Sequence, residues 1–365
     1  MLAPLFPFHQ MVALIPGRLS FTVHQSESEL VEQIRTRPDL FFFSTGIEES
    51  YQPFFDGDLG PINAGDVVEF CRTIRSLLDD KRLQGREIVY YSDPTPESFT
   101  NAVFLLGAYI TLEHPEHAQD AERFCNKCKE FSAFMEYTQD PSKARTCTGV
   151  GVVDCLQGLQ RAVDYGWLAS NSFDSAQYAH GNNPENGDFH RVTDNLIACK
   201  GPCSNPSSDE FCAFIPSLPH YINMLKTAGV TCIIRLNSQD TYDKAAFHAA
   251  GIAHRDIPIQ QQDAFSPPEE AINEFLEICD KTPGTVAVHC SNGLQRTGVM
   301  LAIWMMRRKN FSARAALGLL RVVRPGCGMG ALRSLEKLQQ GGWQQGDCVA
   351  KQRVCERVQD VCMSA

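Results

Sequence analysis

Short apolar segments alternate with helical stretches along the second half of the chain. Residues 230–236, 257–259 and 285–288 are rich in valine and isoleucine, and they are separated by helical stretches at 242–250 and 268–279. This alternation predicts a mainly parallel sheet flanked by helices. Ligands of such sheets bind in the crevice at the carboxyl ends of the strands. We therefore look for chemistry where these strands end.

The first half of the chain repeats this plan. Residues 40–43 and 87–91 have the composition of strands, and the second of them is followed by a polar loop at 92–98 and a helix at 102–112. The predicted fold class is therefore α/β, with two tandem domains that each carry a mainly parallel central sheet flanked by helices. No cysteine and arginine pair follows the strand at 87–91, which predicts that the first domain is degenerate.

The strand at 285–288 leads into the segment T-V-A-V-H-C-S-N-G-L-Q-R-T-G. It delivers His289 and Cys290 into a short loop that closes at Arg296 and Thr297. Successive loop amides and a planar, permanently charged guanidinium are suited to bind the oxygens of a phosphate group. The segment therefore predicts a phosphate-binding loop with Cys290 beneath the bound phosphorus.

Cys290 is the candidate nucleophile of this loop. An ordinary cysteine has a pKa near ~8.5, which loop amides, an adjacent arginine and a helix N-terminus lower, so we expect a thiolate that attacks phosphorus. Thr297 can stabilise the sulfur as it leaves, and His289 is expected to orient the loop rather than react. The residues expected to contact the phosphate group are Ser291, Asn292, Gly293, Leu294 and Gln295.

The spacing of a cysteine and an arginine six positions later occurs three times. Cys155 and Arg161 lie in a stretch with apolar residues at helical spacing, which predicts an amphipathic helix with a core cysteine. Cys327 and Arg333 follow the segment Arg-Pro-Gly, which breaks a strand rather than ending one. Only Cys290 has an apolar strand before it and an apolar helix after it.

Composition limits the classes of partner. The chain has 365 residues, a net charge of -10 and a pI near 5.5, which argues against nucleic acid and anionic membranes and is compatible with a basic peptide. Prolines interrupt the apolar N-terminal stretch, which makes it a poor secretory signal, and no run is long enough to span a membrane. With 15 cysteines and no signal peptide, we expect thiols in an intracellular protein, cytoplasmic or nuclear.

A metal site is a weaker alternative. Cys125 and Cys128 with Cys147, or Cys199 with Cys203, could be proposed as zinc ligands, but neither set is followed by a second pair at the spacing of a zinc finger. We expect no metal and no cofactor.

Distributed segments resemble the cell division cycle fourteen family of dual-specificity protein phosphatases. In that family an inactive N-terminal phosphatase-like domain precedes an active one. The resemblance implies an inactive domain at 19–150, a linker helix and connection at 151–185, a catalytic domain at 186–345 and a short extension at 346–365. It rests on the segments at 54–61, 102–109, 154–158, 185–188, 234–237, 288–290 and 324–326.

The resemblance also nominates a general acid. Family members carry an aspartate on a loop before the phosphate loop, and Asp263, 27 residues before Cys290, matches that position. A positioned acid that protonates the leaving oxygen typically gives ~10²–10⁴-fold in rate. Asp256 is the alternative, but it lies next to the predicted strand at 257–259 and is more simply explained as structural.

Substrates implied by the resemblance are phosphorylated proteins, with phosphoserine followed by proline and a basic residue nearby. Glu185 and Asp188 match acidic positions of the family's substrate groove, although a turn at Asn186 and Gly187 with solvated carboxylates is an open alternative. Residues 178–181 lack acids that relatives carry there, which predicts weaker selection for the basic residue. Homodimerisation is possible, but no pattern supports it.

Three departures from the family pattern affect the expected chemistry. Ser291 and Asn292 replace a lysine–alanine pair, Gln295 replaces a glycine, and residues 330–333 replace a segment whose glutamine positions the hydrolytic water. The last departure predicts slow hydrolysis of the cysteinyl-phosphate. A phosphopeptide-binding pseudophosphatase and a phosphoinositide phosphatase remain as alternatives, the second disfavoured by Ser291 and the acidic pI.

Overall fold

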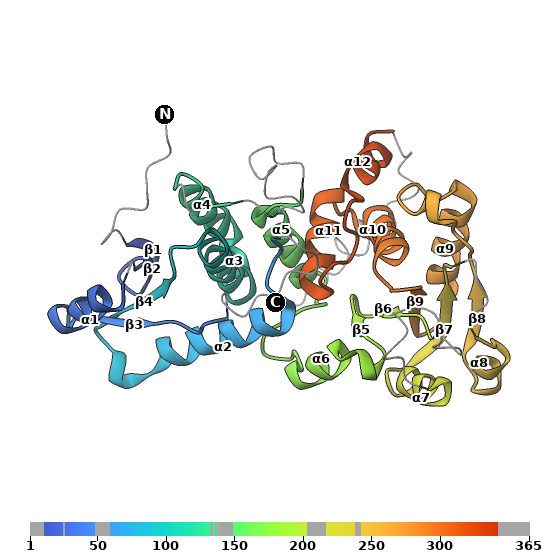
Figure 1. Cartoon of the computed structure of the whole chain (residues 1–365), viewed down its shortest axis with the longest axis horizontal. Coiled ribbons are helices and arrows are strands. Elements are labelled where there is room, and N and C mark those ends of the chain that lie inside the picture. Colours follow the sequence, from blue (N-terminus) through green and yellow to red (C-terminus); the bar gives the residue numbers. More distant parts are fainter. Residues whose placement is uncertain are drawn as a thin grey trace, which may run out of the picture.

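The computed structural model describes residues 11–24, 26–47, 59–131, 134, 135, 137, 149–202, 217–237 and 242–341. These residues form two sheets at opposite ends of an elongated molecule, with helices gathered between and around them (Figure 1). No helix among these residues is long and apolar enough to cross a membrane.

The N-terminal sheet has the strand order β1-β2-β4-β3. Strands β2, β4 and β3 are parallel, and the edge strand β1 is antiparallel to β2. The strands are β1 (Val12–Ile15), β2 (Leu19–Val23), β3 (Leu40–Phe43) and β4 (Glu87–Ser92). The helices of this half are α1 (Glu27–Thr36), α2 (Ala64–Asp79), α3 (Pro96–Glu113) and α4 (Ala118–Cys128), with 3-10 turns η1 (Lys81–Leu83) and η2 (Pro115–His117).

The C-terminal sheet has the strand order β5-β6-β9-β7-β8. All neighbours are parallel except the edge pair β5 and β6. The strands are β5 (Phe189–Arg191), β6 (Leu196–Lys200), β7 (Val230–Arg235), β8 (Ala253–Asp256) and β9 (Thr285–Cys290). The helices are α5 (Val152–Asp164), α6 (Ser175–Asn182), α7 (Leu218–Thr227), α8 (Ala245–Ala249), α9 (Glu269–Lys281), α10 (Gln295–Lys309), α11 (Ala313–Val323) and α12 (Leu332–Gln340), with 3-10 turns η4 (Pro184–Asn186) and η6 (Gln261–Asp263).

The predicted fold class is confirmed: both halves are α/β, with mainly parallel sheets covered by helices. One predicted strand was wrong. The segment 257–259 is not a strand; β8 ends at Asp256, just before it. The amides of Ile257 and Ile259 still donate to carbonyls of Arg235 and Leu236, but Pro258 between them has no N–H and cannot take part in a regular ladder.

Helices α5 and α11 join the two halves at the centre of the molecule, where Figure 1 shows them side by side. Two glycines allow their backbones to touch. A Cβ on Gly158 would lie 2.5 Å from the carbonyl oxygen of Ala315, and a Cβ on Gly318 would lie 2.5 Å from that of Asp154. Either side chain would separate the helices, so glycine is required at both positions.

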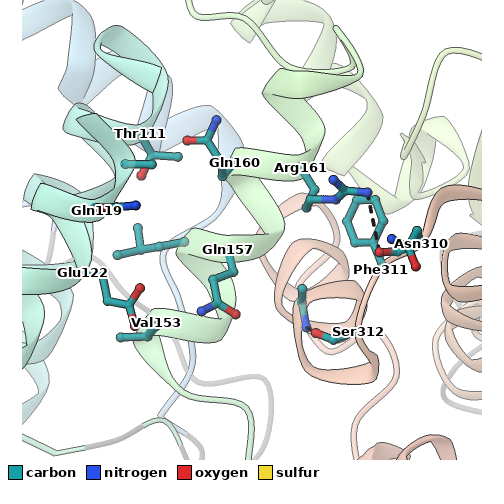
Figure 2. A pocket seen from close by; sticks show the side chains of 13 residues that line it. Thr111, Gln119, Glu122, Val153, Gln157, Gln160, Arg161, Asn310, Phe311 and Ser312 are labelled. Atoms are coloured by element: carbon teal, nitrogen blue, oxygen red, sulfur yellow. Dashed lines mark hydrogen bonds between the residues drawn. The ribbon is translucent and has the colours of Figure 1, made fainter. Parts of the chain in front are cut away.

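The same junction carries a shallow groove on one side, drawn in Figure 2. Thr111, Gln119 and Glu122 from α3 and α4 lie on one side of α5, and Phe311 and Ser312 from the α10–α11 turn lie on the other. Arg161 of α5 donates to the carbonyl of Lys309 at 2.7 Å and lies over the Phe311 ring. The junction is therefore held by polar as well as backbone contacts.

Candidate active site

Strand β9 brings Cys290 to the carboxyl edge of the C-terminal sheet. Every residue of this strand is buried, since it lies between β6 and β7 in the middle of the sheet. The Cys290 side chain is only 1% exposed. The central strand thus delivers the cysteine into a protected position, directly before the loop that leads to α10.

The loop after Cys290 turns through Gly293, which has φ +67°. A Cβ at this position would lie 2.0 Å from the carbonyl oxygen of Cys199. The positive φ angle and this close contact each require glycine here. The side-chain oxygen of Asn292 accepts from the amide of Leu294 at 3.1 Å and lies 3.6 Å from Cys290 Sγ. Leu294 is the N-cap residue of α10, and its side chain cannot accept a hydrogen bond. The first backbone amides of α10 therefore have no side-chain acceptor at the cap.

Arg296 lies in the first turn of α10 and is buried, with 8% exposure. Its guanidinium donates through Nη1 to the carbonyl of Ile259 and through Nη2 to Ser291 Oγ, both at 3.1 Å. These bonds fix the plane of the guanidinium at the loop and tie the loop to the segment before Asp263. The remaining donors of the fork are suited to bind phosphate oxygens.

The pKa of Cys290 is lowered from its ordinary value although the thiol is buried. Burial alone raises it, but the hydroxyl and amide of Thr297, the charge of Arg296 and the amide of Gly293 together outweigh that effect. Cys327 and Cys199 are equally buried, and although the charge of Arg324 opposes the effect, burial raises the pKa of each to about 12. Of these three thiols, only that of Cys290 has a pKa below its ordinary value.

His289 is completely buried and joins a chain of hydrogen bonds beneath the loop. Its Nδ1 lies 3.0 Å from the carbonyl of Cys290, which can only accept, so Nδ1 carries the proton and Nε2 accepts from the hydroxyl of Tyr242 at 2.7 Å. That hydroxyl lies 2.8 Å from His254 Nε2, which donates to it. The pKa values of His289 and His254 are both lowered to about 4, chiefly by burial. This neutral chain orients the backbone of the cysteine, as expected for His289.

Arg324 supports the loop from below. It is 1% exposed, and it donates to the carbonyls of Gly293 at 2.9 Å and Asn292 at 3.1 Å. Both carboxylate oxygens of Asp188 accept from the same guanidinium at 2.8 Å, so the ion pair is bidentate. Asp188, with φ +44°, reaches this pair from the turn before β5. The structure thus places Asp188 under the phosphate loop, with its carboxylate committed to Arg324.

Asp263 lies in the 3-10 turn η6, partly exposed. Among the described residues its carboxylate has no hydrogen bond or ion pair, which leaves it available to a substrate. Two residues earlier, Gln261 Nε2 donates to Gln295 Oε1 at 3.0 Å. This bond and the Arg296–Ile259 bond hold the Asp263 segment against the phosphate loop. Gln295, which replaces the glycine of the family pattern, therefore makes a side-chain contact that glycine could not make.

Asp256, the alternative acid, is an ion-pair residue. Its carboxylate accepts from Arg235 Nε at 2.7 Å and from Lys244 Nζ at 3.2 Å. Glu185 is exposed on η4 at the turn before Asp188. The structure brings together Cys290, Arg296, Thr297 and the loop between them, while Glu185 stands apart as a surface residue.

The cysteines of the other two cysteine–arginine pairs are core residues. Cys155 is buried within helix α5, as predicted. Cys327 is buried in the turn after Arg324 and donates to the carbonyl of Leu294 at 3.5 Å. Among the residues that the structure describes, no group of three or more histidine, cysteine or acidic side chains is arranged to hold a metal ion; Cys147 and Cys203 lie outside those residues.

Tyr242, His254, Arg324 and Gln261 were missed by the sequence analysis. Each acts through a partner far away in the chain, such as Asp188 for Arg324, so spacing gives no signal for it. The Arg-Pro-Gly segment was noted as a strand breaker and as part of the family resemblance, but its arginine was given no role, although it is the largest fully buried side chain among the described residues.

Comparison with known proteins agrees with this geometry. A family model described as "Dual specificity protein phosphatase, N-terminal half" matches residues 13–162, and one described as "Polymorphic toxin system, DSP-PTPase phosphatase" matches residues 215–310. The dual specificity protein phosphatase CDC14AB of Danio rerio is 31% identical over 88% of this chain and 52% of its own length. The chain belongs to the CDC14 family of dual-specificity protein phosphatases.

Other CDC14 relatives give the same result. The dual specificity protein phosphatase CDC14B of Mus musculus is 30% identical over 91% of this chain and 66% of its own, and the tyrosine-protein phosphatase cdc-14 of Caenorhabditis elegans is 29% identical over 88% and 45%. The chain thus spans about half to two thirds of the length of these curated relatives. A solved structure of kinase associated phosphatase covers 40% of this chain and 86% of its own at 19% identity, with a TM-score of 0.34, too low to bear on the assignment.

Proposed function

We propose that the chain is a dual-specificity protein phosphatase that hydrolyses phosphoserine, phosphothreonine and phosphotyrosine through a cysteinyl-phosphate. The observation that carries this proposal is the placement of the buried Cys290 at the end of β9, directly before the turn at Gly293 and the buried Arg296, where these surroundings lower the pKa of its thiol despite burial. A structural cysteine at this depth would have a raised pKa, as Cys327 does. Membership of the CDC14 family supports the same function.

The first step follows from the arrangement of the loop. The Cys290 thiolate attacks phosphorus while the loop amides and Arg296 hold the three equatorial oxygens. The bond from phosphorus to the substrate oxygen breaks, and the carboxyl group of Asp263 gives its proton to that oxygen. Asp263 is suited to this role because it is partly exposed and its segment is bound to the phosphate loop through Gln261 and Gln295.

In the second step water attacks the cysteinyl-phosphate. The phosphorus–sulfur bond breaks, the Asp263 carboxylate takes a proton from the water, and Thr297 stabilises the returning thiolate. Residues 330–333 hold no glutamine to position this water; Ala331 and Leu332 are buried there instead. We therefore propose that this step is slow. A burst of aryl alcohol followed by slower turnover is expected in rapid-mixing kinetics with an aryl phosphate, and a steady rate without a burst would remove this part of the proposal.

The substrate preference proposed from the family is phosphoserine followed by proline, with a basic residue nearby. Glu185 is exposed and remains a candidate to contact that basic residue. Asp188 is bound to Arg324, so we propose a positioning role for it. Peptides with and without a lysine after the Ser-Pro pair, tested on wild type and Glu185→Gln, would measure how much selection remains. We also propose an intracellular role in cell-cycle or cytoskeletal control, which a search for its phosphoprotein substrates in cells would test.

The decisive experiment compares Cys290→Ser with Cys327→Ser on a panel of phosphopeptides. We expect Cys290→Ser to lose at least ~10³-fold in kcat, because an alcohol is not ionised at neutral pH, while Cys327→Ser stays active. Asp263→Asn should lose ~10²–10⁴-fold on phosphoserine peptides and far less on nitrophenyl phosphate, whose leaving group needs no proton. Phosphate release that survives Cys290→Ser would refute the assigned nucleophile, and phosphopeptide binding without turnover by wild type would identify a pseudophosphatase.

A further inference from the structure

A cavity of about 220 Å³ lies between strand β5, the segment that leads into α6, and helix α11. Its apolar walls include Trp167, Leu168, Phe173, Leu319 and Val323, and Tyr178 and Arg191 add polar groups beside them. Ser172, Asp174 and Gln177 also line it and are exposed, so a molecule can enter from solvent. The cavity belongs to neither the phosphate loop nor the groove of Figure 2, whose lining residues are different.

One polar group of this cavity is a buried donor without a partner. His190 lines the cavity, is 2% exposed and accepts a hydrogen bond at Nδ1 from Arg324 Nη1 at 2.9 Å. Because an arginine can only donate, Nδ1 carries no proton, and the proton of the neutral ring must lie on Nε2. His190 Nε2 is buried and has no hydrogen-bond partner among the described residues.

We propose that this cavity binds a small neutral molecule that combines a compact apolar body with one hydrogen-bond acceptor, which accepts from His190 Nε2. An apolar cavity of about 150 Å³ is enough to hold benzene, so this one has room for a monocyclic aromatic ketone.

The cavity is connected to the phosphate loop through a single residue. Arg324 donates to His190 at one side and to the carbonyls of Asn292 and Gly293 at the other. An acceptor on Nε2–H makes Nδ1 a better acceptor, because hydrogen bonds in a chain polarise one another. A bound molecule therefore strengthens the bond from Arg324 to His190 and weakens the bonds from Arg324 to the loop, because the donations of one guanidinium compete. It lowers the affinity of the loop for a phosphate-like anion. This second part rests on the proposed phosphate-binding function of the loop.

The test uses acetophenone and ethylbenzene, which have similar apolar bodies and differ in the acceptor oxygen. Dissociation constants from ligand-observed NMR on the full chain should favour acetophenone by roughly fivefold, the value of one hydrogen bond to a buried donor. His190→Asn keeps an acceptor for Arg324 at the Nδ1 position and removes the donor, so it should abolish the preference. Ala169→Leu fills the cavity and should abolish binding of both probes, while Ala118→Leu adds the same side chain to the groove of Figure 2 and should not.

Several results would overturn the proposal. Equal binding of the two probes, a ketone preference that survives in His190→Asn, or binding that survives in Ala169→Leu each excludes the assigned site. For the connection to the loop, acetophenone should weaken tungstate binding roughly twofold, and an unchanged or tightened tungstate affinity would refute it. A chain that binds acetophenone but no tungstate would instead count against the proposed phosphatase function, so the two failures are distinguishable.

Discussion

The molecule contains two strand–loop–helix units of the same plan that differ at the start of the helix. In the first unit, β4 leads to α3, whose Thr95 hydroxyl accepts from the amide of Ser98 at 3.2 Å. Pro96 at its first position has no N–H, and Glu97 places a negative charge in the first turn. In the second unit, β9 leads to α10, whose N-terminus has no side-chain cap. The first turn of α10 contains no acidic residue and carries Arg296.

From this difference we expect the second unit, and not the first, to bind an anion. A helix N-terminus attracts phosphate only while its amides are free and its surroundings are not negative. The first unit satisfies its amides internally, which favours stability, and α3 is buried along its length from Ser98 to Leu112. The second unit leaves donors unsatisfied and depends on neighbours such as Arg324 to hold its loop in place.

The largest expected effect comes from the guanidinium of the second unit. Arg296→Lys replaces a planar fork by a point charge and loses the bonds to Ile259 and Ser291, so kcat/KM should fall on the order of 10³-fold. Steady-state hydrolysis of nitrophenyl phosphate measures this. Arg82→Lys, an exposed arginine of the first half paired with Asp80, is the matched control and should leave the rate unchanged. Equal losses in both variants would show that the effect is not specific to the loop.

The next effect concerns the support beneath the second unit. Asp188→Ala leaves the buried Arg324 without its counter-charge, and breaking such a pair costs about 3–5 kcal/mol in the free energy of unfolding. Urea unfolding, with the similarly placed but surface-exposed Glu185→Ala as control, measures the loss. If Asp188→Ala were as stable as wild type and only raised KM for lysine-containing peptides, Asp188 would belong to a substrate groove after all.

A third effect is pH dependence, and it belongs to the surroundings of the second unit. The pKa values of His254 and His289 are lowered to about 4 and that of His190 to about 3, chiefly by burial. An unfolded histidine titrates near ~6.5, so between there and pH 4 the unfolded chain binds more protons than the folded one. Stability is therefore fully present above about pH 6.5 and falls as the pH decreases, by about 1.4 kcal/mol per pH unit for each histidine.

His254→Asn should reduce that slope by the contribution of one histidine, and His114→Gln, which replaces an exposed histidine of the first half, serves as the comparison. Urea unfolding at a series of pH values compares the slopes. A slope that is the same in His254→Asn and wild type would mean that His254 is protonated in the folded chain.

The smallest effects are expected from removing the capping hydroxyl of the first unit and adding one to the second. Thr95→Ala removes the hydroxyl that caps α3 and should cost about 1 kcal/mol in the free energy of unfolding, with no change in phosphatase activity. Leu294→Ser introduces a hydroxyl that competes for the first amides of α10 and should weaken tungstate binding. Calorimetry of tungstate binding checks this, and a Leu294→Ala variant separates the hydroxyl from the loss of the leucine side chain. Unaltered binding in Leu294→Ser would mean that those amides do not contact the anion.

The sequence predicted those features that are local in the chain. The phosphate loop is contiguous, so its strand, cysteine, glycine and arginine could be found together, and the degenerate first domain could be inferred from the same strand–loop–helix plan. The strand predicted at 257–259 failed because Pro258 carries no N–H, although its neighbours remain extended and hydrogen-bonded. The apolar composition of a segment does not show which of its backbone amides can join the hydrogen-bond ladder of a sheet.

The support of the site could not be predicted because it is non-local. Asp188 and Arg324 are 136 residues apart, and the turn at Asn186 and Gly187 gave no sign that it aims a carboxylate under the loop. Tyr242 was assigned to a helical stretch by its neighbours, whereas helix α8 begins at Ala245 and leaves the tyrosine free to reach His289. Such contacts depend on how the strands are ordered in the sheet, which one sequence does not reveal.

Gly158 and Gly318 have a consequence for how such a chain can evolve. Because the main chains of α5 and α11 touch there, and α5 also packs against α3 and α4, the first half is joined to the second through α5. Removing α5 would expose the apolar face of α11 to water, and adding even a methyl group at either glycine would push the two helices apart. A first half that is predicted to lack chemistry of its own is in this way built into the architecture of its neighbour.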